Sequence, residues 1–414
     1  MLDFFIKNFF EVWQQSASSM AVLWPFILFL TPIGLAILLW KMRAYYVRRL
    51  FIKKQKFVLL EIRLPQDVFK SPAAMELVLN ALYQTGGEVN AYNYIWLGKS
   101  RPVFSLEIAS IDGVVHFYVW TREPLKNLIE ATIYSQYPNV EIYKIDDYTK
   151  DIFFDKSDFT LFGTEFISTK PDPYPIKTYK DYGMDKDPKE EYKIDPLSPL
   201  IEFFGSIGKG EQLWLQYVVQ ACAKDSKKEH DESAKKIINE QLARDAKTRL
   251  PTTVNAQGYP VMVQMSTGEK DVVEAIYRHL DKPLFQVGIR SLYIGKGKAF
   301  NPTNISGLLG IMKQFNSSNL NGLKLKNVTS FDDYPWSDIF KYRTPRARRR
   351  MLHAYKLRSF FHPPYDKHNH DKVTNVYSSE ELATMFHLPS RTVSTPTLAR
   401  TNSRKVEAPA NLPM

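Results

Sequence analysis

The stretch that most constrains this chain is MAVLWPFILFLTPIGLAILLW, Met20 to Trp40, which has no charged residue in 21 positions. A helix rises about 1.5 Å per residue, so this stretch would reach about 31 Å, enough to cross a hydrocarbon core about 30 Å thick. Trp24 lies near one end and Trp40 at the other, where indole rings favour the membrane interface. We therefore predict a transmembrane helix over residues 20–40.

Two other interpretations of the apolar stretch are a secretory signal peptide and a buried core helix. A signal peptide begins with basic residues and ends at a small-residue cleavage site, whereas this chain begins with Asp3 and Glu11 against Lys7. A core helix is disfavoured because the stretch lacks polar positions. Before the stretch, residues 1–19 carry three charges spaced four residues apart, which predicts an amphipathic segment at the outer interface.

The charges that flank the predicted span predict its orientation. Residues 41–56 carry seven basic and no acidic side chains, whereas residues 1–40 carry a net charge of −1. Basic flanks remain in the cytoplasm, so we expect a single-pass protein of the inner cell membrane with its amino end outside and residues 41–414 inside. The flank is interpreted first as a stop-transfer signal and second as a lipid-headgroup or nucleic-acid patch. Its charged residues are Lys41, Arg43, Arg48, Arg49, Lys53, Lys54 and Lys56.

The basic character of the chain belongs to its flanks. The whole chain has a net charge of +11, but residues 57–340 carry −4 and residues 341–414 carry +9. The charge of the globular body alone therefore gives no nucleic-acid-binding surface. The single cysteine, Cys222, excludes an intramolecular disulfide and a cysteine-rich metal site, and we interpret it as a small core residue.

The body has the pattern of two α+β units. Residues 57–146 contain a strand, a helix, a hairpin that turns at Asp112 and Gly113, a second helix and a strand, which is the β-α-β-β-α-β order of the ferredoxin-like arrangement. Residues 147–199 are rich in Asp, Lys, Tyr and Pro and are predicted to be a connector with some ordered structure, including a strand pair in FTLFGTEFIST. Residues 200–340 give a similar skeleton once one charged helix is treated as an insertion.

The predicted fold class is therefore α+β, with a single N-terminal transmembrane helix, two ferredoxin-like units and an extended basic C-terminal tail over residues 341–414. Near the end of the tail, Ser378 and Glu381 have the spacing of a capping box and predict the start of a helix. The apolar side chains that follow lie on one helical face or just beyond it. We predict that they dock a partner: Leu382, Met385, Phe386, Leu388 and Pro389.

Motifs for catalysis are lacking. The glycine-rich stretches GSIGKG and GKGKAF do not have the spacing of a phosphate-binding loop. His368 and His370, with Asp366 and Asp371, suggest a divalent metal ion, but no cysteine assists and the spacing matches no established ligand pattern. A hydrolase that uses these histidines or His362 is the weakest alternative. We predict that the chain is not an enzyme and has no cofactor.

The densest run of positive charge is KYRTPRARRRMLHAYKLRSFF, residues 341–361. A basic helix here could contact nucleic-acid phosphates or anionic lipid. Its apolar residues Leu352, Tyr355 and Phe360 predict that one face packs on protein. The candidate contact residues are Arg346, Arg348, Arg349 and Arg350.

Several stretches resemble, in this order, the membrane-anchored amino-terminal region of a bacterial family linked to type IV secretion and conjugation ATPases. They include FVLLEIRLPQDVFKSPAAMELVLNALYQTG, YPIKTYKDYG, DPLSPLIEFFGSIGKGEQLWLQ, FQVGIRSLYIGKGKAF, GIMKQFNSSNLNGLK and the EELATMFHLPS tail. In that family, best known from candidate-phyla bacteria, the tail leads into a motor domain of the coupling-protein type. No catalytic residue of the family lies in the matching region, and this chain ends before any motor.

The resemblance implies a membrane-anchored, non-enzymatic accessory scaffold of a type IV secretion-like system. Such a scaffold would dock a coupling-type motor ATPase at the cytoplasmic face of the membrane, and it could form a homo-oligomer. The alternative function is a membrane-tethered nucleic-acid-binding protein that contacts DNA through residues 341–361.

Overall fold

The computed structural model describes residues 2–65, 70–86, 90–153, 159–184, 194–248, 267–331, 334, 336, 338, 340–365, 374–389 and 400–401. The chain divides into two compact units. The first consists of Met1–Lys54 and Gly87–Ser100, and the second of Gln55–Gly86 and Arg101–Met414.

The first unit contains helix α1 (Leu2–Lys54) and the short helix α3 (Ala91–Ile95). From Leu28 to Lys54, α1 is long and apolar enough to span a membrane, and a signal sequence would pass the same test. The apolar side chains of this part are exposed: Phe29 is 72% exposed and Leu39 is 65% exposed. A helix packed in a protein core would bury such side chains, so the interpretation as a core helix does not hold.

Helix α1 continues without a break across both boundaries between the segments that the sequence analysis separated, residues 1–19, 20–40 and 41–56, and ends at Lys54. The basic segment continues the helix because Lys, Arg and Leu are good helix formers. Helix α3 packs against this end of α1. The guanidinium carbon of Arg43 lies 4.1 Å from the centroid of the Trp96 ring.

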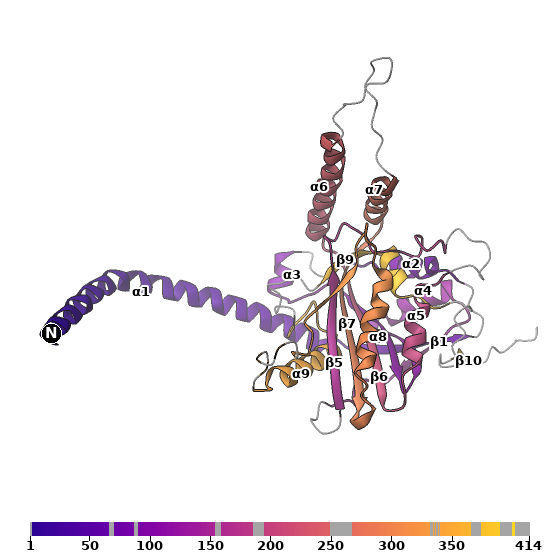
Figure 1. The fold of residues 1–414 in the computed structure, drawn as a ribbon, viewed down its shortest axis with the longest axis horizontal. Coiled ribbons are helices and arrows are strands. Elements are labelled where there is room, and N and C mark those ends of the chain that lie inside the picture. Colours follow the sequence, from indigo (N-terminus) through magenta and orange to yellow (C-terminus); the bar gives the residue numbers. More distant parts are fainter. Residues whose placement is uncertain are drawn as a thin grey trace, which may run out of the picture. The chain divides into compact units, whose positions relative to one another are not determined.

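The second unit is built on a mixed α+β architecture with one large, almost wholly antiparallel sheet (Figure 1). The strand order is β10-β1-β3-β2-β6-β7-β5-β8, with β4 also paired to β1 and β9 to β7. Among the strands in the described part of the chain, only the short β10 pairs in parallel. The strands are β1 (Phe57–Pro65), β2 (Val103–Ile111), β3 (Val114–Arg122), β4 (Glu141–Ile145), β5 (Phe159–Ser168), β6 (Glu211–Ala221), β7 (Leu284–Lys296), β8 (Leu323–Lys326), β9 (Asn375–Ser378) and β10 (Arg400–Thr401).

The sheet consists of two halves with the same connectivity. The first half has the order β4-β1-β3-β2 and the second has β8-β5-β7-β6, so corresponding strands occupy corresponding places. The halves meet along β2 and β6, which pair antiparallel from Val103 opposite Gln220 to Ile111 opposite Gln212. The second half begins with β5, which lies within the stretch predicted as a connector over residues 147–199, because this strand finds partners in both β7 and β8.

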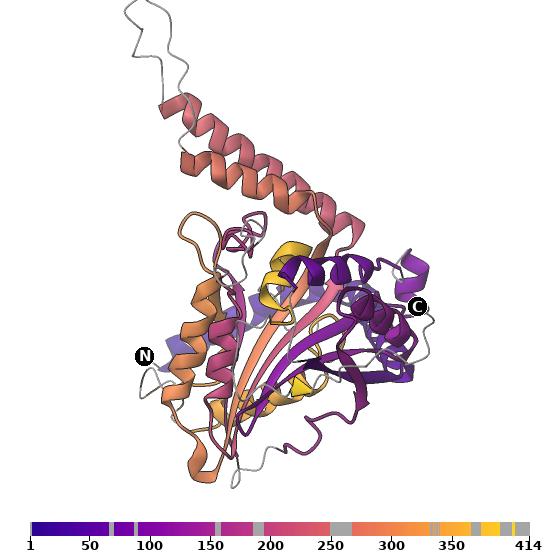
Figure 2. The ribbon, with the colours of Figure 1, turned by 90° about the vertical axis from the view of Figure 1, so that its right-hand side faces the viewer.

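Helices cover both faces of the sheet (Figure 2). Alternate strand residues face opposite sides, so Leu60 and Ile62 join the larger core, whereas Leu59 joins the smaller one. The larger core lies under α2 (Pro72–Ala81), α4 (Lys126–Gln136), α5 (Ser198–Gly205), α8 (Thr303–Ile311) and α10 (Ser379–Met385). The smaller core lies under α9 (Arg343–Lys356).

Two helices between β6 and β7 form a projecting pair, α6 (Lys224–Thr248) and α7 (Thr267–Leu280) (Figure 2). Near the sheet they share a small cluster that includes Ala234, Ile238 and Ile276. The charged helix that the sequence analysis treated as an insertion is therefore an insertion in the second half of the sheet. The short 3₁₀ helices are η1 (Glu123–Leu125), η3 (Gly297–Ala299) and η4 (Met312–Phe315).

The capped helix near the end of the chain is present as α10, and the capping box between Ser378 and Glu381 is confirmed. The structure corrects the role predicted for its apolar residues. Leu382, Met385, Phe386 and Leu388 are buried in the larger core of this same chain, where α10 packs on α2 and β9, and Pro389 is also buried. Side chains that already fill a core offer no surface to a partner. The corrected residues are Leu382, Met385, Phe386, Leu388 and Pro389.

Candidate anion-binding site

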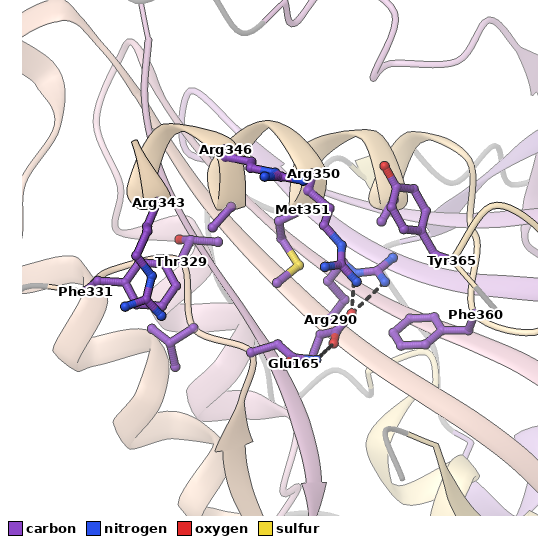
Figure 3. A pocket seen from close by; sticks show the side chains of 14 residues that line it. Glu165, Arg290, Thr329, Phe331, Arg343, Arg346, Arg350, Met351, Phe360 and Tyr365 are labelled. Atoms are coloured by element: carbon purple, nitrogen blue, oxygen red, sulfur yellow. Dashed lines mark hydrogen bonds and ion pairs between the residues drawn. The ribbon is translucent and has the colours of Figure 1, made fainter. Parts of the chain in front are cut away.

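A pocket of about 410 Å³ lies between α9 and the sheet (Figure 3). One wall is a face of α9, and the other comes from β5, β7 and the segment that follows β8. Its lining combines arginines with aromatic rings and a few small or apolar side chains. The lining residues are Glu165, Arg290, Asn327, Val328, Thr329, Phe331, Arg343, Arg346, Ala347, Arg350, Met351, Ala354, Phe360 and Tyr365.

Helix α9 presents a row of arginines to the pocket. Arg343, Arg346 and Arg350 follow one another at intervals of three and four residues, which places them on one helical face. The adjoining face buries Leu352 and Tyr355 against the sheet, as the sequence analysis predicted. Packing on one face therefore fixes the direction in which the arginines point (Figure 3).

Both ends of α9 are held by polar contacts. At the amino end, the carboxylate of Asp338 accepts hydrogen bonds from the backbone N–H of Arg343 at 3.0 Å and of Thr344 at 2.9 Å, as a helix cap does. Just after the carboxyl end, Arg358 donates to the buried carboxylate of Glu107 at 3.0 Å and 3.1 Å. The contact of Arg358 with Glu107 on β2 thus ties the carboxyl end of the pocket wall to the sheet.

The base of the pocket is an ion pair between neighbouring strands. Arg290 on β7 stands opposite Glu165 on β5 and donates to its Oε1 from Nη2 at 2.6 Å and from Nε at 3.1 Å. The other carboxylate oxygen, Oε2, accepts from the side-chain amide of Asn327 at 2.7 Å. Both oxygens of Glu165 are therefore occupied by groups other than the arginines of α9.

The pocket has a strong excess of positive charge. Among the described residues that line it, four are arginines and Glu165 is the one carboxylate. Because both oxygens of Glu165 are engaged by Arg290 and Asn327, this carboxylate is not paired with Arg346 or Arg350. Guanidinium groups bind phosphate and carboxylate oxygens with paired hydrogen bonds. The arrangement is suited to bind an anion.

Aromatic rings hold the guanidinium groups at the two ends of the pocket. The guanidinium carbon of Arg343 lies 4.6 Å from the centroid of the Phe331 ring, and that of Arg350 lies 5.6 Å from the centroid of Tyr365. Such cation–π contacts fix the orientation of a flexible side chain. Burial raises the pKa of Tyr365 above its usual value, although Arg350 and Arg290 act in the opposite direction. Its hydroxyl is therefore protonated at neutral pH.

Further aromatic side chains precede α9. Tyr334 and Trp336 are stacked, with ring centroids 5.3 Å apart. Phe340 and Tyr342 are 79% and 78% exposed. Large aromatic rings exposed next to arginines are typical of surfaces that bind an unpaired nucleic-acid strand.

The structure separates the four arginines that the sequence analysis grouped. Arg346 and Arg350 line the pocket, whereas Arg348 and Arg349 lie on other faces of α9. Arg343 was missed, although its spacing from Arg346 and Arg350 is visible in the sequence. Arg290 and Glu165 were also missed, and no local pattern marks them, because they come together only by strand pairing.

The remaining predicted sites have less support. Lys41, Arg43, Arg48, Arg49, Lys53 and Lys54 lie in α1, and Lys56 follows it. His362 is buried, whereas Asp366, His368, His370 and Asp371 lie outside the described residues. Within the described part of the chain, no group of three or more His, Cys, Asp or Glu side chains is placed to hold a metal ion.

A family model described as "Domain of unknown function (DUF8128)" matches residues 54–401, which include the whole sheet and the arginine-lined pocket. No curated protein matches the chain.

Proposed function

The chain belongs to the DUF8128 family, and we propose that it is a membrane-anchored, non-enzymatic module that binds nucleic acid through α9. The observation that carries this proposal is the row of Arg343, Arg346 and Arg350 beside a carboxylate, Glu165, that is already engaged. Successive helical turns rise about 5.4 Å, so an extended chain of phosphates can contact the three guanidiniums in succession.

The anchor in this proposal is α1. The stretch from Leu28 to Lys54 has the length and composition of a span, and the basic residues that follow the apolar part favour the orientation with the body in the cytoplasm. Protease treatment of sealed, right-side-out vesicles tests this orientation. Cleavage of the body from the outside, or release of the chain by carbonate, would contradict it.

Nucleic-acid binding is tested with the full chain in nanodiscs of neutral lipid and a fluorescent single-stranded oligonucleotide. Replacing Arg346 and Arg350 by Ala should weaken binding and lower the slope of log affinity against log salt by about 1.4, since each phosphate contact on a single strand contributes about 0.7. The matched control replaces Lys235 and Lys236, two exposed lysines of α6, by Ala. This control removes the same charge from another surface and should keep the wild-type slope.

Two results would defeat the proposal. One is binding that does not change between low and moderate salt, and the other is an equal loss in the α9 and α6 variants. Vesicles of phosphatidylglycerol provide a further test, because anionic lipid would use the same arginines. If the wild-type chain binds these vesicles through Arg346 and Arg350 but never binds the oligonucleotide, the surface is a lipid site instead.

A second proposal rests on the sequence resemblance alone: the chain is an accessory scaffold that docks a coupling-type motor ATPase in a type IV secretion-like system. Its docking surface would have to lie outside α10, whose apolar side chains are buried. Recovery of an ATPase with the full chain from its own cells tests this role. A full chain that recovers no ATPase would refute it.

We also propose that the two halves of the sheet are duplicated ferredoxin-like units. The support is the repeated order, β4-β1-β3-β2 and β8-β5-β7-β6, with a helix after the first and third strand of each half. An experimental structure in which one half has another order would refute the duplication.

A further inference from the structure

Resting on the proposed nucleic-acid binding, we infer that the pocket between α9 and the sheet receives one unstacked nucleotide of a single strand. Its base would lie between the aromatic ends of the pocket, and its phosphate against the arginines of α9. The proposal assigns to the surface a preference for single strands over duplexes, which a row of positive charges alone does not give.

The size and lining of the pocket suit a small planar anion. Its volume of about 410 Å³ lies in the range of roughly 300–1,000 Å³ that is usual for small-molecule sites. A base within a duplex is stacked on both faces and paired along its edge, so it cannot enter such a pocket without being flipped out. An unpaired strand can present a base without that cost.

The aromatic side chains provide flat surfaces for the base. Phe331 lies at one end of the pocket and Tyr365 at the other (Figure 3). Arg343 and Arg350 lie over these two rings, and guanidinium groups can themselves stack on an unpaired base. Stacking on such surfaces tolerates every base, because each base has an aromatic face.

The polar groups at the base of the pocket contribute little sequence readout. Arg290 and Asn327 donate to Glu165, and the hydroxyl of Thr329 accepts a hydrogen bond from the backbone N–H of Gly163 at 2.8 Å. These contacts are made within the protein, so the base edge meets groups that are already engaged. We therefore expect similar affinity for strands of different sequence.

The test uses the full chain in neutral nanodiscs with a fluorescent single strand and the duplex of the same sequence. The single strand should bind at least about tenfold more tightly than the duplex. Phe331→Leu and Tyr365→Leu keep apolar bulk but remove the ring, and each should lower single-strand affinity about fivefold or more, since stacking contributes substantially per base. Affinity for the duplex and the salt slope should not change.

Two matched variants separate stacking from general damage. Tyr365→Phe keeps the ring and should bind as the wild type does. Tyr277→Leu removes an exposed ring of α7 that does not line the pocket, and it should leave the preference for the single strand intact. Circular dichroism and thermal unfolding of each variant establish that it is folded before binding is compared.

Competition identifies what occupies the pocket. A nucleoside 5′-monophosphate should displace the single strand at lower concentration than inorganic phosphate does, because it supplies a base as well as a charge. Equal displacement by the two competitors would overturn the inference, as would equal binding of single strand and duplex with no effect of the ring variants. In both cases salt-dependent binding would persist and the proposed function would stand. Loss of all salt-dependent binding would instead contradict both the proposed nucleic-acid binding and the inference about the pocket.

Discussion

Arg290 and Glu165 form a buried ion pair across two neighbouring strands at the base of the arginine-lined pocket. Their side chains are 2% and 8% exposed, and Nη2 of the arginine lies 2.6 Å from Oε1 of the carboxylate. The ring of Phe360 lies over the guanidinium, with 4.0 Å between its centroid and the guanidinium carbon. The pair sets the floor of the pocket and also neutralises a charge that the sheet could not otherwise bury.

Replacing Glu165 by Gln should destabilise the protein strongly. The change keeps the size of the side chain but leaves Arg290 buried without a counter-charge, which typically costs about 3–5 kcal/mol. The free energy of unfolding in urea measures the effect. The double variant Glu165→Gln/Arg290→Met should recover much of the loss, because no charge is then buried.

The control for this prediction is Asp146→Asn. Asp146 pairs with Lys150 at the surface, where its side chain is 97% exposed. Solvent screens such a pair, so the urea midpoint should not move. A Glu165→Gln variant that unfolds at the wild-type midpoint would show that the buried pair makes no net contribution.

Gly288→Ala should disturb the wall of the pocket. A Cβ atom at this position of β7 would lie 2.5 Å from Cγ of Phe360, so the ring would have to leave its place over Arg290. Overpacking of this kind typically costs about 1–3 kcal/mol. Thermal unfolding measures the change.

Gly310 provides the matched glycine, because a Cβ there meets no atom within 4 Å and the residue lies in α8. Gly310→Ala should stabilise the helix by about 0.5–1 kcal/mol. Equal behaviour of the two variants would contradict the close contact between Gly288 and Phe360.

Asp195 should contribute to stability at neutral pH and lose that contribution in acid. Burial acts to raise the pKa of Asp195, but the charge and hydrogen bond of His387 and the backbone N–H of Leu197 outweigh it, so the pKa lies below its ordinary value of 3.8. His387 Nε2 lies 3.1 Å from the carboxylate Oδ1. A lowered pKa in the folded state stabilises the protein above the pKa of the unfolded chain.

The contribution of Asp195 is therefore lost as the pH falls below about 4 through the lowered folded value. Asp195→Asn should reduce the urea midpoint of unfolding at pH 7. The difference in midpoint between variant and wild type should become smaller as the pH approaches 3. A gap that stays constant over this range would contradict the assignment. The midpoints at each pH provide the comparison.

Cys222 should resist alkylation in the folded protein. The thiol is buried, and burial raises its pKa to about 12, although Arg101 acts in the opposite direction. Only the thiolate reacts readily, so iodoacetamide at pH 8 should modify the native chain far more slowly than the chain in urea. Because Cys222 is the single cysteine, intact mass reports the reaction directly. Equal rates would contradict its burial.

Local features of the fold were predictable because neighbouring residues decide them. The hairpin at Asp112 and Gly113 forms as expected, with both residues at positive φ, 54° and 86°. Such a turn is favoured by Asp followed by Gly. The capping box of Ser378 and Glu381 also forms as expected, because it needs only a spacing of three residues.

Features that depend on distant pairing were not predictable in the same way. The stretch that forms β5 was predicted as a strand pair within a connector, but not as one strand of the large sheet, because its partners, β7 and β8, come more than a hundred residues later. The burial of α10 was missed because an apolar face shows that a helix packs, but not whether its own chain or a partner covers it.

The sequence by itself determined an apolar N-terminal helix of spanning length, an α+β body with basic flanks, and a positively charged α9 with one packed face. These follow from hydropathy, periodicity and charge, which act over a few residues. Only the tertiary structure decided that Arg290 and Glu165, 125 residues apart, close the pocket beneath Arg343, Arg346 and Arg350. Strand register brings those charges together, and register depends on which distant strands bury each other's apolar faces.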